Sequence, residues 1–158
     1  MQKKKFINNS KLPSSMTYDV FELNFAIADD LKDKVWDYLQ KRETFIKPQI
    51  FPFRVEFETG LTHGLFKSGE KNIHHGPLLS VHGEIGEVSN AYRSLYYYYG
   101  SYVLSFRFFR PLLLEFEKSK DGIVVRLHSY VHNKLLSIWR LGNNLFWQNF
   151  KTGLKKLK

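Results

Sequence analysis

Residues 134–158 read KLLSIWRLGNNLFWQNFKTGLKKLK, and this stretch decides the fold. At about 100° of rotation per residue, its apolar side chains fall along one side of a helix and its polar side chains along the other. The predicted apolar stripe comprises Leu135, Trp139, Gly142, Phe146, Phe150, Gly153 and Leu157, flanked by Ile138, Leu145, Trp147 and Leu154. A helix with so broad an aromatic face needs a partner, and we expect it to lie on a sheet.

The sequence at the N-terminal side changes from strand to helix spacing. Residues 17–27 alternate apolar and polar, as a half-buried strand does. Residues 29–41 then repeat their apolar positions at helical spacing, with Asp29 as the predicted N-cap. A second short helical turn is predicted over 43–46, ended by Pro48.

Strand-like alternation fills most of the chain between these helices. The predicted strands cover 53–58, 61–66, 79–85, 91–99, 102–109 and 123–131. Whether 112–117 continues the strand before Pro111 stays open, because proline sits at an edge, a bulge or a strand break. Lys120-Asp121-Gly122 is the strongest hairpin signal. Consecutive strands joined by tight turns leave no room for parallel crossovers, so the pattern predicts an α+β domain with an antiparallel sheet of about seven strands.

The length of 158 residues suits one domain, and 43% hydrophobic with 16% aromatic residues suffices for a large core or a ring-lined pocket. We expect a single domain over 16–158, preceded by a disordered basic tail over 1–15.

The net charge of +9 is concentrated at the two ends of the chain. Eight lysines supply nearly all of it: Lys3, Lys4, Lys5, Lys11, Lys151, Lys155, Lys156 and Lys158. The body of the fold is close to neutral, which argues against a nucleic-acid partner. The lysine-rich ends suit a weak contact with an anionic membrane surface, although solvated tails are the favoured interpretation.

Cysteine is absent, which excludes disulfides and thiol chemistry and fits a reducing cytoplasm, where we expect this protein. The sequence shows no signal-peptide core and no apolar run long enough to span a membrane.

The order of elements resembles the START-like helix-grip superfamily, also called SRPBCC or Bet v 1-like, which includes polyketide cyclase-like proteins. The resemblance covers about 17–157 and rests on the opening strand and helix over 21–39, on Asp121-Gly122, and on the aromatic helix from Leu135. It implies a curved sheet that wraps the C-terminal helix and encloses an apolar cavity. A glycine-rich loop found in some members has no clear equivalent here, and no family catalytic residue is carried over.

If the apolar side of each strand faces the helix, a set of candidate ligand-binding residues follows. The strands contribute Phe53, Val55, Phe57, Val81, Leu95, Leu104, Phe106, Leu114, Phe116 and Leu127, with Tyr97, Tyr99, Tyr102 and Ser129 as polar members. The helix contributes Trp139, Gly142 and Phe146. Phenol or hydroxyl groups of the polar members are expected to orient the polar end of a ligand, while apolar contact supplies affinity.

No charged residue shares this predicted inner face, and acid–base catalysis needs a titratable group at the reacting atom. We therefore predict no catalytic residue. The charged strand residues Arg107, Arg110, Glu115, Glu117 and Arg126 are predicted to form cross-strand ion pairs on the outer face.

Six histidines raise the question of a metal. A zinc site needs three or four converging ligands, and no histidine spacing here is diagnostic, so neither a metal nor another cofactor is predicted. The strand histidines, His82 and His128 among them, are expected to face solvent. A cavity entrance is the alternative for His63, His74, His75 and His82.

Three functions follow from these observations. The preferred one is binding or transport of a hydrophobic small molecule, such as a lipid, a fatty acid or an aromatic metabolite. The second is a cyclase- or dehydratase-like enzyme that uses an entrance histidine with an inner tyrosine. The third is a protein-interaction module of the chaperone-activator type.

Overall fold

The computed structural model describes residues 14–47, 54–76, 79–98 and 108–154, and for Gly76, Leu79, Ser80, Tyr97, Tyr98 and Gly153 it describes the backbone alone. Apart from Ser14 and Ser15, the tail predicted over 1–15 lies outside the described residues. Nearly all of the strand predicted over 102–109 lies outside them as well.

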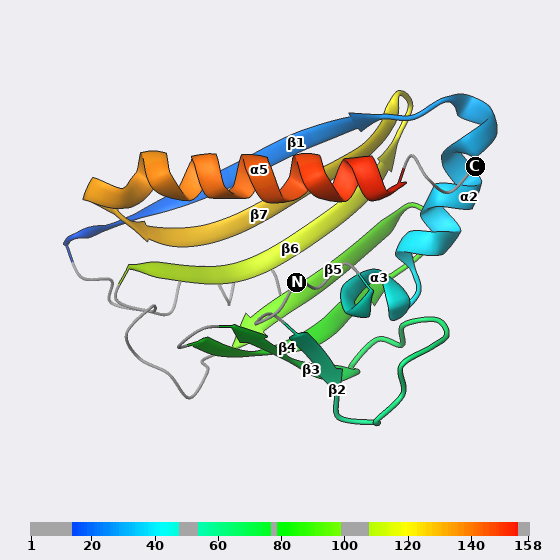
Figure 1. Ribbon diagram of the computed structural model, residues 1–158, viewed down its shortest axis with the longest axis horizontal. Helices are drawn as coiled ribbons and strands as arrows, with labels where there is room; N and C mark the ends of the chain where they lie inside the picture. The colour runs from blue at the N-terminus through cyan, green and yellow to red at the C-terminus, as the bar shows by residue number, and fades with distance from the viewer. Residues whose placement is uncertain (1–13, 48–53, 77–78, 99–107, 155–158) are drawn as a thin grey trace.

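Seven antiparallel strands form one sheet, in the spatial order β1-β7-β6-β5-β4-β3-β2 (Figure 1). The strands are β1 (Met16–Ala26), β2 (Arg54–Phe57), β3 (Lys71–Gly76), β4 (Leu79–Val88), β5 (Tyr92–Tyr98), β6 (Phe109–Ser119) and β7 (Gly122–His132). The helices are α2 (Asp29–Leu39), α3 (Glu43–Ile46), the 3-10 turn η1 (Asn133–Leu135) and α5 (Leu136–Leu154). The predicted α+β class and strand number are confirmed.

The first and last strands lie side by side. β1 pairs with β7 along its whole length, from Met16 opposite His132 to Ala26 opposite Gly122. The strand predicted over 17–27 is therefore confirmed, and it forms one edge of the sheet.

The hairpin between β6 and β7 depends on one glycine. Gly122 has a φ of 148°, and a Cβ at this position would lie 1.9 Å from the carbonyl oxygen of Phe25. Only glycine fits so close to the neighbouring strand, which explains why the Asp-Gly signal marked this turn correctly.

Three local predictions needed correction. Residues 61–66 form no strand: Leu65 makes only an isolated bridge with Lys41, in a segment where glycines at 60, 64 and 69 adopt positive φ. Strand β3 instead occupies the end of the segment predicted as a histidine-bearing loop. Ala28, whose ψ of 144° is extended, is the N-cap of α2 in place of Asp29, and the Asp29 carboxylate accepts a hydrogen bond from Lys32. Pro111, which the sequence left undecided, lies inside β6 at a register shift.

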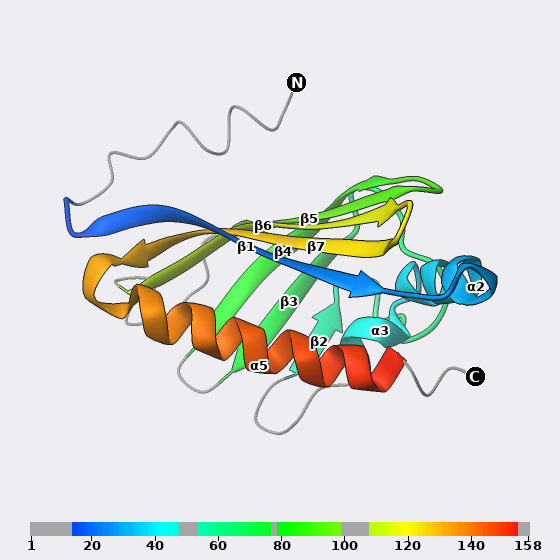
Figure 2. The ribbon, with the colours of Figure 1, turned by 90° about the horizontal axis from the view of Figure 1, so that it is seen from above.

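Helix α5 lies across one face of the sheet over β1 and β7, and its C-terminal end lies near α2 and α3 (Figures 1 and 2). Its sheet-facing residues are Trp139, Trp147, Phe150 and Leu154, which pack into the main hydrophobic core. The predicted stripe was right for Trp139 and Phe150 but wrong for Phe146, which is 52% exposed. Only one of the adjacent rings at 146 and 147 can face the sheet, and the larger indole buries more apolar area.

Candidate functional site

The face of the sheet turned toward α5 is identified by strand register. Leu127 on β7 pairs with Leu114 on β6, which pairs with Leu95 on β5, so these three side chains share a face. All three belong to the buried cluster that includes Trp147 of α5. We call this the helix face of the sheet, and the opposite side the outer face.

Most of the predicted ligand-binding residues that the structure describes lie in this region. Those in the core cluster, or packed against it, are Val55, Phe57, Leu95, Leu114, Phe116, Leu127 and Trp139. Val81 and Ser129 are also buried, at 3% and 0% exposed. The structure therefore brings seven of these residues together in one core and buries the other two as well.

The remaining predictions divide into two groups. Phe146 and Gly142 are exposed on α5, and outside the helix itself no atom of the described residues lies within 4 Å of where a Cβ of residue 142 would be, so close packing against the described sheet does not explain this glycine. The others lie outside the described residues: Phe53, Tyr99, Tyr102, Leu104 and Phe106, and the side chain of Tyr97.

Three buried hydrogen-bonding groups lie between the sheet and α5 without a partner. They are Oγ of Ser129 on β7 and the indole Nε1 atoms of Trp139 and Trp147 on α5, none of which bonds to any residue that the structure describes. Ser129 lies on the helix face, since it alternates with His128 and matches the parity of Leu127. Buried polar groups normally find partners, so unsatisfied ones are informative.

A charged pair adjoins this region. Asp19 on β1 is opposite Ser129 in register and is 5% exposed. Its carboxylate accepts hydrogen bonds from Arg140 of α5, whose Nε lies 3.2 Å from Oδ1, and this bonding raises the pKa of Arg140. The prediction of a helix face without charge was therefore wrong.

A second charge lies on the same face farther along the sheet. Arg93 is opposite Phe116 in register and is 2% exposed. Its guanidinium carbon lies 4.3 Å from the ring centre of Phe116, 4.7 Å from that of Phe66 and 5.1 Å from that of Phe45. A cation over aromatic faces is electrostatically favourable, which explains how an arginine is held among rings. Tyr92 and Ser94, the sequence neighbours of Arg93, gave no signal of this environment.

His74 lies on β3 between Val55 and Val81, and its ring packs edge-on against Phe45. Its Nε2 atom is buried. Burial, assisted by the neighbouring His75, lowers the pKa of His74 to about 4. The ring is therefore neutral near pH 7.

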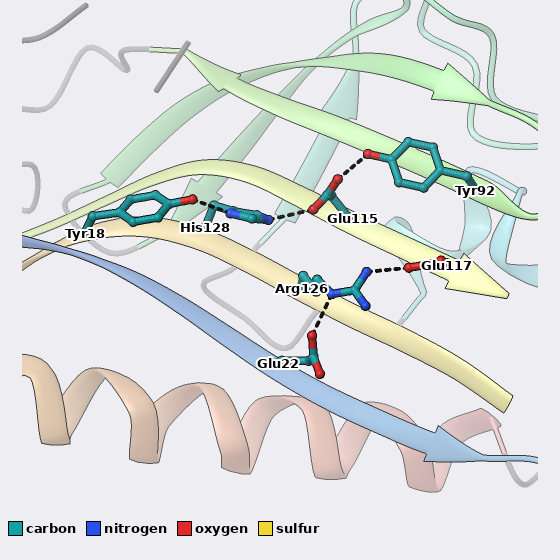
Figure 3. Close-up of polar contacts among 7 residues, drawn as sticks. All are labelled: Tyr18, Glu22, Tyr92, Glu115, Glu117, Arg126 and His128. Atoms are coloured by element: carbon teal, nitrogen blue, oxygen red, sulfur yellow. Dashed lines mark hydrogen bonds and ion pairs between the residues drawn. The ribbon is translucent and has the colours of Figure 1, made fainter. Parts of the chain in front are cut away.

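The outer face carries a row of polar side chains across four strands (Figure 3). The Tyr18 hydroxyl lies 2.6 Å from Nδ1 of His128, and Nε2 of that histidine lies 2.6 Å from Oε2 of Glu115. The Tyr92 hydroxyl donates to the other oxygen of Glu115. His128 is only 9% exposed, so the prediction that it faces solvent was wrong, although the face was right.

This row resembles a relay, yet its acid–base properties do not favour catalysis. Burial, with nearby Tyr130 and Glu115, raises the pKa of the Tyr18 phenol, and burial with the Glu115 bond raises that of Tyr92. Both phenols therefore stay protonated near neutral pH, whereas a nucleophile or base needs the opposite shift. We interpret the row as a hydrogen-bond network that stabilises the sheet.

Ion pairs predicted on the outer face are confirmed at Arg126, which binds Glu117 and lies 2.6 Å from Glu22 (Figure 3). Their hydrogen bonds raise the pKa of Arg126. Glu115, also predicted on this face, bonds to His128 and Tyr92.

Among the described residues, no three His, Cys, Asp or Glu side chains come together to hold a metal ion. No helix in the described ranges has the length and apolarity needed to cross a membrane.

A scan against protein-family models found no match, and no curated protein matches in sequence. Solved structures do match. ChR145 from Cytophaga hutchinsonii has a TM-score of 0.57 at 15% identity, covering 89% of this chain and 94% of that one. MLL2253 from Mesorhizobium loti has a TM-score of 0.57 at 12% identity, covering 90% and 99%. The major latex-like protein 151 of Panax ginseng has a TM-score of 0.51 at 10% identity, covering 91% and 95%.

The chain therefore has the helix-grip fold of the Bet v 1-like, or SRPBCC, proteins, which are its structural neighbours. This confirms the fold that the sequence resemblance implied. A likeness at less than 25% identity shows a shared fold but not a shared function, which depends on the particular residues of this chain.

Proposed function

We propose that this protein binds a small, mostly apolar molecule between the helix face of the sheet and α5. One observation carries the proposal: Ser129, Trp139 and Trp147 each bury a hydrogen-bond donor there without a partner in the described residues. A ligand with carbonyl, ester or hydroxyl oxygens would accept from them.

Without a ligand, these three donors have no acceptor among the described residues. A buried polar group without a partner costs about 1–3 kcal/mol, so a ligand that supplies acceptors to these donors gains affinity. Trp147 packs edge-on against Phe116 at a ring-centre distance of 5.7 Å, so the apolar body of the ligand would lie beside this ring pair and contact it from one side. Apolar contact contributes about 25 cal/mol per Å² of buried surface.

The charges beside the site favour a neutral polar end. Asp19 is opposite Ser129, so an anionic ligand group at Ser129 would meet a carboxylate, although that carboxylate is partly neutralised by Arg140. A neutral lipid or an aromatic metabolite with ketone or hydroxyl groups therefore fits the Ser129 end better than a fatty-acid carboxylate does.

Native mass spectrometry of the purified protein, followed by solvent extraction, tests the proposal. We expect a bound molecule of small mass, with loss of at least part of it in the Ser129→Ala variant. Ser94→Ala is the matched control, because Ser94 is equally buried but lies on the outer face, where its Oγ bonds to the backbone N–H of Glu87.

A ligand-free protein that also fails to take up any member of a panel of ketones, sterols and aromatic polyketides contradicts the proposal. So does a crystal structure in which the aromatic side chains leave no space between Ser129 and Trp147.

A further inference from the structure

The surface of α5 that points away from the sheet carries an aliphatic stripe. Ile138, Leu141 and Leu145 are 62%, 59% and 63% exposed. Their spacing of three and then four residues places them on one line of the helix, nearly opposite the buried line of Trp139, Trp147 and Phe150. We call these three residues the outer stripe.

Most exposed apolar residues occur singly and need no explanation. The outer stripe differs because its members are consecutive on one line of a helix whose other side is already buried. The described part of the chain places no partner on it, since all three side chains remain more than half exposed. An apolar line on the outside of a helix indicates an occupant.

The charged residues of α5 and of the segments that flank it in the sequence are all basic. From Gly122 to the C-terminus the sequence contains no Asp or Glu. Lys134, in the 3-10 turn η1 directly before α5, is exposed, and Lys151 follows the stripe near the C-terminal end of α5. Lys155, Lys156 and Lys158 continue the positive run in the sequence.

The positive charge of the helix favours one partner for the outer stripe over another. A second copy of the chain, paired through the same stripe, would bring two cationic helices together without any acidic residue on either to offset the repulsion. An anionic surface complements the lysines instead. An apolar line bordered by lysines is also the pattern of helices that lie in the membrane interface.

We infer that α5 docks the protein on an anionic lipid bilayer, with the outer stripe entering the interface and Lys134 and Lys151 meeting lipid phosphates. The geometry suits this role, because α5 is an outer layer of the molecule and lies flat along one face of the sheet (Figure 2). The inference does not depend on the ligand site, which uses the opposite side of the same helix.

The test is co-sedimentation of the full chain with vesicles of phosphatidylcholine alone and of phosphatidylcholine mixed with phosphatidylglycerol. We expect binding to the mixed vesicles, weakened by high salt, and about tenfold weaker binding for the Leu141→Ser, Leu145→Ser double variant. The matched control is Leu61→Ser, Leu65→Ser, which removes two leucines that are 50% and 59% exposed away from α5 and leaves binding unchanged.

Three results overturn the inference. The first is absence of binding to the mixed vesicles, and the second is unchanged binding of the double variant, which would assign the contact to the lysines alone. The third is a dimer in sedimentation velocity that the double variant converts to monomer, which would assign the stripe to a second copy. Circular dichroism of every variant separates loss of binding from loss of folding. The single variant Ile138→Ser is included because one substitution disturbs the fold less than two.

Discussion

Oε2 of Glu115 on β6 lies 2.6 Å from Nε2 of His128 on β7, and both side chains are buried on the face of the sheet that α5 does not cover. The outer face of this sheet therefore has a buried polar centre of its own. Tyr18 and Tyr92 complete it from the flanking strands β1 and β5.

Replacing Glu115 with alanine is expected to lower the free energy of unfolding by about 3 kcal/mol. The change removes the acceptor of both His128 and Tyr92 from a site that is 2% exposed, and buried charged hydrogen bonds are costly to break. Urea denaturation measures the effect. Glu87→Ala on the exposed part of β4 is the control and is expected to stay within about 0.5 kcal/mol of wild type. Equal losses in both variants would contradict the buried network.

The variants Arg42→Ala and Arg54→Ala each remove one partner of an ion pair, the first from a buried pair and the second from an exposed pair. The Nε atom of Arg42 lies 2.7 Å from Oε1 of Glu70, and both side chains are at most 4% exposed, so Arg42→Ala is expected to cost about 3–5 kcal/mol by leaving a buried carboxylate. Arg54 pairs with Glu56 at 3.2 Å, but these side chains are 66% and 53% exposed. Arg54→Ala is expected to cost less than about 1 kcal/mol. Thermal or urea unfolding that ranks the two the other way would refute this difference.

The lowered pKa of His74 predicts that the protein loses stability in mild acid. Its pKa is about 4 in the folded protein, below its ordinary value of 6.5. Between these two pH values the unfolded chain binds a proton at this histidine and the folded chain does not. The contribution of neutral His74 is thus fully present above about pH 6.5 and falls by up to about 3 kcal/mol as the pH drops toward 4.

Unfolding free energies of wild type and His74→Leu across this range measure the effect, and we expect the variant to lose less stability on acidification. His63→Gln, in which the replaced ring is 75% exposed, is the control and should follow wild type. Parallel curves for wild type and His74→Leu would show that His74 does not carry the linkage.

Two glycines give opposite predictions for the same substitution. Gly142→Ala is expected to raise the free energy of unfolding by about 0.5–1 kcal/mol, because position 142 lies inside α5 with open space around it. Gly122→Ala is expected to lower it by several kcal/mol, since the added Cβ would collide with the Phe25 carbonyl. A destabilising Gly142→Ala would mean that the helix surface there is in contact with something that the described residues do not include.

The sequence predicted the fold well because its signals were local and periodic. Two-residue alternation marked β1 and β7, and the Asp121-Gly122 turn marked the hairpin that joins β6 to β7. Predictions failed where the outcome depended on competition between neighbours. The adjacent rings of Phe146 and Trp147 both suit a core, and only packing against Phe116 decided that the indole is inside.

The second kind of wrong prediction concerned the buried charges on the helix face. A polar residue on a strand's apolar side is visible in a sequence, but its environment is not. Ser129 was placed correctly because its parity matches Leu127. Arg93 was missed because three rings from separate elements make its site favourable, and Asp19 because its partner Arg140 lies far away in the chain. Contacts of this kind exist only after the sheet has formed.

The pairing of β1 with β7 also determines when the protein can fold during synthesis. Met16 leaves the ribosome long before its partner His132 has been made. Until β7 has been made, β1 is an apolar strand with both edges open, which is a hazard for association with other nascent chains. Contacts between such distant parts of a chain slow folding, so the period of risk is set by translation speed and then by closure of this one edge.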